Sequence, residues 1–340
     1  MDHTNREMSL KQTLRIFFTD FWEPFDAQSN IWIDILSTKY DICLTSEKTD
    51  FLFYSCFGHN HIKFDCVKIF IIGENISPDF NFCDYACGFD YINFEDRYIR
   101  MPLFRHYISD EVHQRHDLGF FTQESQSKKK FCNFLYSNGR NASPLREQFF
   151  DRLSTYKAVD SGGRFRNNTG FIVDDKRRWQ RQYKFTIAFE NSCKNGYTTE
   201  KIYDALCAHT IPIYWGNPRI AEDFNPERFI SCHDFASFDA VVERVKELDS
   251  DPARYAEMLS RPWFSSGPPP ALRDDPEYAG FLLAIVAQGP ENARRTTRYG
   301  ATSLYLGEQE FLDKVAPLCS VLQRIRNGIR RLKRIMWSRS

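Results

Sequence analysis

Glu200 and Lys201 stand where a polar loop is predicted to enter a helix. The segment before the loop, 184–189, reads KFTIAF, and the segment after the helix, 211–215, reads IPIYW; both are rich in residues that favour strands. Between the two segments an apolar stripe recurs at i, i+3, i+4 and i+7, which predicts a helix: Ile202, Ala205, Leu206 and His209. The charged pair therefore lies in a strand-loop-helix-strand unit.

This unit has the chemistry of a phosphate site. It is the crossover of a parallel sheet, and its loop lies at the carboxyl end of a strand, where open α/β sheets bind ligands. Thr198 or Thr199 is expected to cap the helix, whose free N–H groups and positive dipole end suit an anion. Lys201 adds a full positive charge. The residues alone indicate a phosphate-containing ligand, and many folds satisfy that description.

Glu74 is a second residue in a position that favours chemistry. It follows the apolar run VKIFII (67–72) and Gly73, so we expect it at the carboxyl end of a buried strand. A carboxylate there can take a proton from an attacking hydroxyl. A second interpretation stays open at this point, in which Glu74 is a turn carboxylate that caps the next segment.

Two further motifs contain charged residues. Arg166 follows Gly162-Gly163, a pair that lets a ligand approach the backbone closely, and an arginine can bind a phosphate with two donors. A solvated surface arginine is the alternative. Asp249-Ser250-Asp251 has a spacing found in some metal sites, but it follows the helical pattern VVERVKEL and precedes Pro252. We interpret it as a helix-ending turn.

Alternating strands and helices are needed to position these residues. Strands are expected at 14–18, 40–44, 50–55 and 67–72, with a helix over 30–37. The second half repeats the pattern, with a strand at 130–137, a helix that opens at Ser143-Pro144, and the unit described above. Two such sets predict an α/β fold with two Rossmann-like domains facing a cleft. The polar stretch 106–130 is interpreted as an excursion over that cleft.

The charge is balanced but segregated. The chain has 45 basic and 45 acidic residues, and seven of the basic ones lie between 324 and 339, where there is no acid. The body is therefore acidic, which argues against a general nucleic-acid binder. The ten cysteines form no C-x-x-C pair, which favours buried free thiols in a reducing compartment. We expect no secretory signal and no transmembrane helix, because the apolar runs are far shorter than about 18 residues.

The last 28 residues, 313–340, contain an amphipathic pattern. An apolar stripe lies under a basic face and consists of Leu318, Val321, Leu322, Ile325, Ile329, Leu332 and Met336. A helix of this kind can lie on an anionic membrane. A helix packed on the body of the protein, or a frayed tail, is the alternative.

Four blocks of residues, in order between about residue 70 and residue 235, resemble the α1,3/α1,4-fucosyltransferases of glycosyltransferase family 10, and the bacterial members in particular. One block opens with Gly73-Glu74-Asn75, and another pairs Asp96-Arg97-Tyr98 with Arg100-Met101-Pro102-Leu103. A third is Gly162-Gly163 with Arg166-Asn167. The fourth runs from Phe189-Glu190-Asn191 through Gly196-Tyr197 and Thr199-Glu200-Lys201-Ile202 to Trp215-Gly216.

The resemblance implies a fold and a set of roles. The fold is GT-B, with an N-terminal acceptor domain (1–142), a C-terminal GDP-fucose-binding domain (143–312) and a basic amphipathic tail (313–340). Glu74 matches the catalytic base. The matched donor-binding positions are Arg166, Asn191, Tyr197, Glu200 and Lys201, with Arg166 and Lys201 on the diphosphate and Glu200 on the ribose. No metal is required, and Mn²⁺ or Mg²⁺ stimulates turnover.

The expected activity is inverting transfer of L-fucose from GDP-fucose to a GlcNAc hydroxyl of an N-acetyllactosamine-type glycan, which gives Lewis-type structures. The linkage, α1,3 or α1,4, stays open. The expected location is the inner face of the cytoplasmic membrane, where the tail binds anionic lipid beside lipid-linked acceptors. Two alternatives remain: a GT-B enzyme with another donor or acceptor, and a membrane-associated glycan-binding protein without turnover. A dinucleotide oxidoreductase is disfavoured because no G-x-G-x-x-G follows the first strand.

Overall fold

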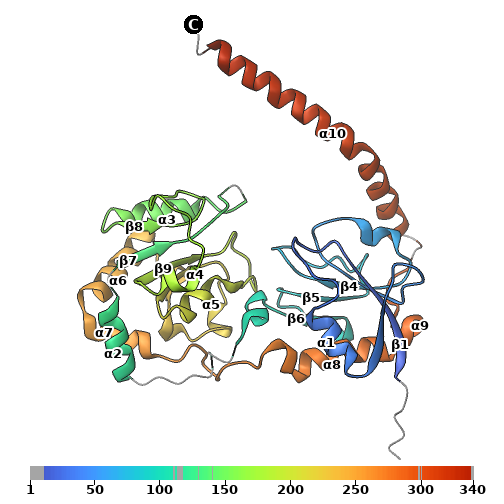
Figure 1. Ribbon diagram of the computed structural model, residues 1–340, viewed down its shortest axis with the longest axis horizontal. Helices are drawn as coiled ribbons and strands as arrows, with labels where there is room; N and C mark the ends of the chain where they lie inside the picture. The colour runs from blue at the N-terminus through green and yellow to red at the C-terminus, as the bar shows by residue number, and fades with distance from the viewer. Residues whose placement is uncertain are drawn as a thin grey trace, which may run out of the picture.

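Two parallel β-sheets, each covered by helices, form the body of the protein (Figure 1). The computed structural model describes residues 11–109, 112, 118–128, 130–139, 141–297, 299 and 301–337, and in the last range the side chains of 303–322 and 325. The central strands, such as Phe51–Tyr54 and Tyr183–Phe189, are buried on both faces and read as nearly continuous apolar runs, which is the pattern of parallel sheets; the edge strand Tyr40–Leu44 is largely exposed. The predicted α/β class with two Rossmann-like units of GT-B type is confirmed.

The first sheet has the order β2-β1-β3-β4-β5-β6, and every pairing is parallel. Its strands are β1 (Gln12–Thr19), β2 (Tyr40–Leu44), β3 (Phe51–Tyr54), β4 (Val67–Ile71), β5 (Tyr85–Gly88) and β6 (Tyr98–Arg100). Helix α1 (Ile31–Ser37) follows β1 and is capped by Asn30, whose side chain accepts from the N–H of Ile33. Because all strands are parallel, the loops after them meet at one edge.

The second sheet has the order β11-β10-β9-β7-β8 and is also parallel throughout. Its strands are β7 (Lys130–Phe134), β8 (Val159–Ser161), β9 (Tyr183–Phe189), β10 (Ile211–Trp215) and β11 (Ile230–Ser231). The helices around it are α2 (Leu118–Ser127), α3 (Leu145–Ser154), α4 (Lys176–Gln180), α5 (Glu200–Cys207), α6 (Phe238–Ser250) and α7 (Pro252–Ser260). Three residues of the predicted α5 stripe, Ile202, Ala205 and Leu206, are fully buried, whereas the fourth, His209, lies after the end of the helix with a φ of +52°.

The boundaries between the two domains differ from those that the sequence predicted. The expected boundary at 142/143 is wrong for β7, which lies before it and belongs to the second sheet. It is also wrong for α8 (Pro276–Ala287) and α9 (Gly289–Ala293), which pack into the core of the first sheet. Trp32 of α1 donates its indole N–H to the hydroxyl of Tyr278 on α8 at 2.6 Å. The first domain is therefore built from two separate parts of the sequence.

The stretch 106–130 is not the excursion over a cleft that its polarity suggested. A short 3₁₀ segment, η3 (Leu103–Tyr107), is followed by α2, which lies beside α7 (Figure 1). Phe121 of α2 is 5% exposed and belongs to the core of the second sheet. Phe120, which is partly buried, packs against the same core, so the polar surface of α2 concealed two apolar contacts. Residues 110, 111, 113–117 and 129 lie outside the described part of the chain.

Helix α10 (Ala301–Trp337) starts earlier than the predicted tail and projects away from both sheets (Figure 1). Near its start the ring of Tyr305 packs on Phe82 of the first domain at a centroid distance of 5.8 Å. Four residues of the predicted stripe are exposed, namely Leu318, Val321, Leu322 and Ile325. The side chains of Ile329, Leu332, Met336 and the basic residues from Arg324 onward lie outside the described side chains. Among the described residues, no helix combines the length and apolar character that crossing a membrane requires.

Candidate active site

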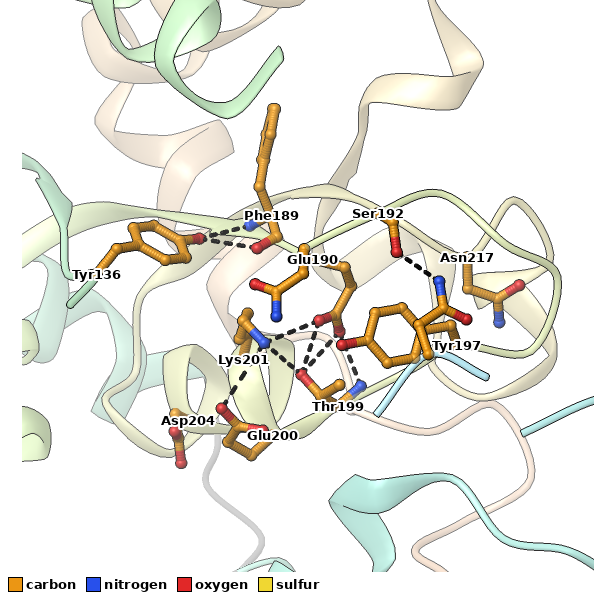
Figure 2. Close-up of polar contacts among 12 residues, drawn as sticks. Tyr136, Phe189, Glu190, Ser192, Tyr197, Thr199, Glu200, Lys201, Asp204 and Asn217 are labelled. Carbon is orange, nitrogen blue, oxygen red and sulfur yellow. Dashed lines mark hydrogen bonds and ion pairs between the residues drawn. The ribbon is translucent and has the colours of Figure 1, made fainter. Parts of the chain in front are cut away.

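The strand order of the second sheet marks its ligand edge. After β7 the chain adds β8 on one side of β7 and then β9 on the other side, so the direction reverses between β7 and β9. Open α/β sheets bind ligands outside the carboxyl ends of the strands at this reversal. The hydroxyl of Tyr136, just after β7, donates to the carbonyls of Ile187 and Phe189 at 2.8 and 3.1 Å. This tyrosine ties the two strand ends together, and Figure 2 shows its contacts with Phe189, the residue before Glu190.

A buried arginine lies under the same edge. Arg146 of α3 is 1% exposed, and its guanidinium donates to the carbonyl of Phe189 at 3.0 Å and to Oδ1 of Asn191 at 2.7 Å. Its guanidinium also stacks on the ring of Tyr136, 4.0 Å from the centroid. Sequence analysis did not select this residue. The available signal was its place on the apolar stripe of the helix, in register with Phe149 and Leu153, where an unpaired charge would be costly.

We define the donor loop as residues 190–201. Its first residue, Glu190, makes the hydrogen bonds that hold the loop against the start of α5. Its carboxylate is fully buried and accepts from the backbone N–H of Thr199 at 2.8 Å, from the Thr199 hydroxyl at 2.7 Å, and from Nζ of Lys201 at 3.0 Å (Figure 2). Thr199 is the N-cap of α5, as predicted, but its hydroxyl serves Glu190 and not the helix. One carboxylate thus fixes both the start of α5 and its lysine.

Lys201 and Glu200 are ionised in this setting. Burial opposes the charge on Lys201, but Glu190 and Glu200 outweigh it and raise the pKa of its ammonium above the ordinary value. Burial likewise opposes the charge on Glu200, and Lys201 and Lys176 outweigh it and hold the pKa of that carboxyl below its usual value. The Lys201 ammonium lies 3.8 Å from Glu200 and 3.0 Å from Glu190. The start of α5 therefore presents a fixed cation and a fixed anion side by side.

Asn191 and Tyr197, the other predicted donor residues, lie in the same loop. Asn191 is held by Arg146, and its carbonyl accepts from the N–H of Ser143 at 2.7 Å. Tyr197 is 2% exposed and packs edge-on against Phe89 of the first domain at 5.0 Å. In Figure 2 the Tyr197 ring lies beside the Glu190 carboxylate. The structure brings these two residues together with Glu200 and Lys201.

Glu74 reaches this loop from the first domain. It lies just after β4, at the predicted strand end, and its side chain is exposed. Its neighbour Asn75 donates to the Ser192 hydroxyl of the donor loop. Burial, followed by the charges of nearby groups that include Glu190 and Glu74, raises the pKa of Tyr197. The hydrogen bond of Asn75 therefore places the segment that carries the candidate base beside the donor loop.

Arg166, predicted to bind the diphosphate, contacts α3 in this structure and not the donor loop, and its role in binding the donor stays a prediction. Its guanidinium forms a bidentate ion pair with Asp151 and a 2.5 Å contact with Glu147, both on the outer face of α3, and it lies over the ring of Phe150. Two carboxylates one helical turn apart neutralise this arginine. Within the described residues the arginine beneath the donor loop is Arg146.

The D-x-D carboxylates have structural contacts. Asp249 pairs with Lys184 at 2.7 Å and with Lys157 at 3.1 Å, while Asp251 caps α7 by accepting from the N–H groups of Ala253 and Arg254. The interpretation of Asp251 as a helix-boundary residue agrees with the structure. Across the described residues, no group of three or more metal-binding side chains is found.

A large cavity of about 1160 Å³ lies away from these residues, between α2, α4 and the segment 260–268. Several arginines line it, but Arg181 pairs with Glu124 at 3.0 Å and Arg261 pairs with Glu257 at 2.8 Å. None of the residues that line it belongs to the donor loop. The size of this cavity does not identify it as the active site, because the buried and paired charges of Glu190 and Lys201 lie in the donor loop and not in the cavity.

Family models match both domains. The Alpha-(1,3)-fucosyltransferase FucT N-terminal domain matches residues 16–107, and the Glycosyltransferase family 10 (fucosyltransferase) C-terminal model matches residues 125–264. A crystal structure of an alpha1,3-fucosyltransferase superposes with a TM-score of 0.69 at 30% identity and covers 86% of this chain and 93% of that one. The chain belongs to glycosyltransferase family 10. The predicted family is thereby confirmed.

Relatives of this family 10 protein carry informative names. The alpha-(1,3)-fucosyltransferase FucT of Helicobacter pylori is 35% identical over 285 residues, which are 72% of this chain and 59% of the relative. A 3-galactosyl-N-acetylglucosaminide 4-alpha-L-fucosyltransferase of Bos taurus is 35% identical over 132 residues, 38% of this chain and 35% of that protein. The chain thus spans about three fifths or less of these relatives. An alpha1,3-fucosyltransferase structure with GDP-fucose superposes with a TM-score of 0.67 at 29% identity, covering 87% and 95% of the two chains.

Proposed function

We propose that this family 10 protein transfers L-fucose from GDP-fucose to a hydroxyl of a glycan acceptor. The observation that carries the proposal is the position of Lys201: the lysine is held by buried Glu190 at the start of α5, and Asn75, the neighbour of Glu74, binds Ser192 of the same loop from the other domain. Family membership and the relatives' names support the same donor. One domain then binds the donor, and the other supplies the base.

The donor diphosphate is proposed to lie at the start of α5. Its charge meets the Lys201 ammonium and the free N–H groups of the first helical turn, while Arg146 adds a buried positive charge behind the loop. Glu200 is proposed to accept hydrogen bonds from the ribose hydroxyls, and Asn191 and Tyr197 to line the donor. These groups supply the positive charge that a leaving diphosphate needs, so we expect turnover without a metal and stimulation by Mn²⁺ or Mg²⁺.

The reaction is proposed to proceed with inversion. The acceptor hydroxyl oxygen attacks C1 of fucose, the C1–O bond to the diphosphate breaks, and the bonding electrons leave with GDP. Glu74 takes the hydroxyl proton as the new C1–O bond forms, while the sugar passes through an oxocarbenium-like state. Attack opposite to the leaving group reverses the configuration at C1. Glu74 suits this role because it is exposed and because its neighbour Asn75 donates to the Ser192 hydroxyl of the donor loop.

The acceptor is proposed to be an N-acetyllactosamine-type glycan that receives fucose on GlcNAc, giving Lewis-type products. Phe57 supports a sugar at this position. Its ring lies against Gly73, next to Glu74, and is 46% exposed. An exposed aromatic face beside a catalytic acid is a surface on which the C–H face of a pyranose can stack.

A location is proposed from α10. The exposed apolar residues of this helix, together with the basic sequence after residue 323, suit the surface of an anionic membrane. We propose a cytoplasmic protein that lies peripherally on the inner face of the cytoplasmic membrane, where a lipid-linked acceptor is within reach.

The test is an assay of the full chain with GDP-fucose and, in parallel, a type 1 and a type 2 disaccharide, with the product linkage determined by NMR. We expect fucose on GlcNAc, at O3 of the type 2 acceptor or at O4 of the type 1 acceptor, and we expect transfer to persist in EDTA. GDP-fucose binding without transfer to either acceptor would favour the glycan-binding alternative. Absence of any GDP binding would reject GDP-fucose as the sugar donor. Complete loss in EDTA that a metal reverses would reject the metal-free mechanism.

A further inference from the structure

The sequence block Arg100-Met101-Pro102-Leu103 has no role in the chemistry described so far, yet it crosses the domain boundary. Arg100 is the last residue of β6 in the first domain. Both terminal nitrogens of its guanidinium bind the carboxylate of Asp223 in the second domain, at 2.7 and 2.8 Å. The Asp223 side chain is 5% exposed and that of Arg100 is 21% exposed. The pair is bidentate and largely shielded from water, which are the conditions under which such a pair is strong and specific.

The remaining donors of Arg100 connect the donor loop to the first sheet. Nε donates to the carbonyl of Phe89 at 3.1 Å, and Nη2 donates to the carbonyl of Gly196 at 3.2 Å. Leu103, three residues later, donates its N–H to the carbonyl of Thr198 at 3.0 Å. Two residues of one short block therefore bind the donor loop at alternate carbonyls.

Gly196 explains why the two backbones can approach so closely. Its φ is +90°, a conformation that glycine adopts without strain. A Cβ at this position would lie 1.9 Å from the carbonyl oxygen of Phe89. Any other residue would separate the donor loop from the first domain at the point where Arg100 joins them.

Asp223 extends the same network into the donor loop. Its carboxylate also accepts from the Thr198 hydroxyl at 2.8 Å, and Asn217 bridges the Thr198 hydroxyl and the N–H of Gly196 at 3.0 and 2.8 Å. On the other side, Tyr91 is enclosed between two guanidinium groups, with Arg100 4.0 Å and Arg219 3.6 Å from its centroid. The segment 196–198, which leads directly into Thr199, Glu200 and Lys201, is thus held from both domains.

We propose that Arg100 and Asp223 form an interdomain clasp that positions the donor loop against the acceptor domain, so that the donor sugar stays in register with Glu74. The inference rests on the proposed function for its kinetic consequence, but not for the clasp itself. Arg100 is a positioning residue: it binds the carbonyl of Gly196 directly and acts on Thr198 through Asp223. Loss of the clasp lets the donor loop move relative to the acceptor, so that water competes with the acceptor hydroxyl for fucose.

The test compares Arg100→Lys with a matched control, Arg97→Lys. Arg97 belongs to the same sequence region but binds only first-domain carbonyls, those of Asp84, Cys83 and Phe80, at 2.8, 3.0 and 3.3 Å. Lysine keeps the positive charge at either position but lacks the planar guanidinium that donates two parallel hydrogen bonds. For Arg100→Lys we expect transfer to fall about tenfold or more. We also expect a larger fraction of GDP-fucose lost to hydrolysis, and faster hydrogen exchange of the amides of residues 196–203. For Arg97→Lys we expect a lower melting temperature with the hydrolysis fraction and loop exchange unchanged.

Asp223→Asn breaks the pair from the other side and serves if Arg100→Lys does not fold. The double variant should be close to the worse single variant, because each removes the same contact. Unchanged loop exchange in both single variants, or equal changes in Arg97→Lys, would overturn the clasp. If the parent protein transfers no fucose and binds no GDP, the proposed function fails, while the exchange measurement still decides whether Arg100 holds the loop.

Discussion

Glu74 and Glu190 occupy comparable places and have opposite surroundings. Each follows a buried parallel strand, β4 for Glu74 and β9 for Glu190, and each lies at the carboxyl edge of its sheet. Glu190 is fully buried and holds the start of α5 through Thr199 and Lys201. Glu74 is exposed, and within the described part of the chain its carboxylate accepts no hydrogen bond. The comparison teaches that a strand-end glutamate builds the site when it is buried and paired, and is free to move a proton when it is neither.

The largest expected effect is on Glu74. Glu74→Gln keeps size and hydrogen-bonding capacity but cannot take the acceptor proton, so we expect transfer to fall by about 10²- to 10⁴-fold. GDP-fucose affinity, measured by calorimetry, should stay within a few-fold of the parent. A near-parental kcat would show that the base is another residue and would remove Glu74 from the comparison.

Substitution of Glu190 should lower the stability of the fold, whereas substitution of Glu74 should lower the rate of transfer. Glu190→Ala leaves Lys201 and Thr199 without their buried partner, and breaking a buried ion pair costs about 3–5 kcal/mol of unfolding free energy. Glu74→Ala is the matched control and should change that free energy by no more than about 0.5 kcal/mol, because its side chain is exposed. Urea unfolding of both variants measures the difference. Equal losses in the two variants would contradict the division of roles.

Lys201 connects the two roles, since Glu190 positions it and the donor is proposed to use it. Lys201→Ala should weaken GDP binding by about tenfold or more, because a hydrogen bond to a charged group is worth about 1.5–3 kcal/mol. Calorimetry with GDP alone measures this without the transfer reaction. An unchanged affinity would remove Lys201 from the diphosphate site.

Arg146 and Arg166 allow the same comparison between two arginines. Arg146→Lys loses the hydrogen bonds to Phe189 and Asn191, and a loss of about 1 kcal/mol should weaken GDP binding about fivefold. Arg166→Lys should leave GDP binding unchanged within error, because its contacts are with Glu147 and Asp151. A larger effect at Arg166 than at Arg146 would restore the assignment made from the sequence.

The smallest effect on GDP affinity is expected from removal of the C-terminal residues. Removing residues 321–340 should abolish cosedimentation with anionic vesicles and leave GDP affinity unchanged, because α10 projects away from the donor loop (Figure 1). Binding of the full chain should weaken as salt rises, since charges are screened over about 10 Å at 0.1 M. Neutral vesicles are the control. Failure of the full chain to bind anionic vesicles at low salt would reject the membrane proposal.

Local signals in the sequence predicted most of the strands and the centre of the donor site. The apolar runs before Glu74 and Glu190 define strands by themselves, and the capped stripe after Thr199 defines α5. Arg146 and Arg166 could not be ranked, because each has an arginine's chemistry and only tertiary packing decides which one lies under the loop. The domain exchange of α8 was hidden for a similar reason: its apolar face fits a core, but nothing local says which core.

The return of α8 and α9 to the first sheet has a consequence for how the protein is made. Leu282 and Ile285 cover a core whose six strands are synthesised before residue 101. At about 5–20 residues per second, the ribosome needs roughly 9–35 s to pass from the end of the first sheet to these helices. The second domain, which ends with α7, is complete by then. The nascent chain therefore finishes its C-terminal unit first, while one face of the N-terminal sheet is covered by α1 but not yet by α8 and α9. The apolar residues left exposed on that face are where a chaperone would be needed during translation.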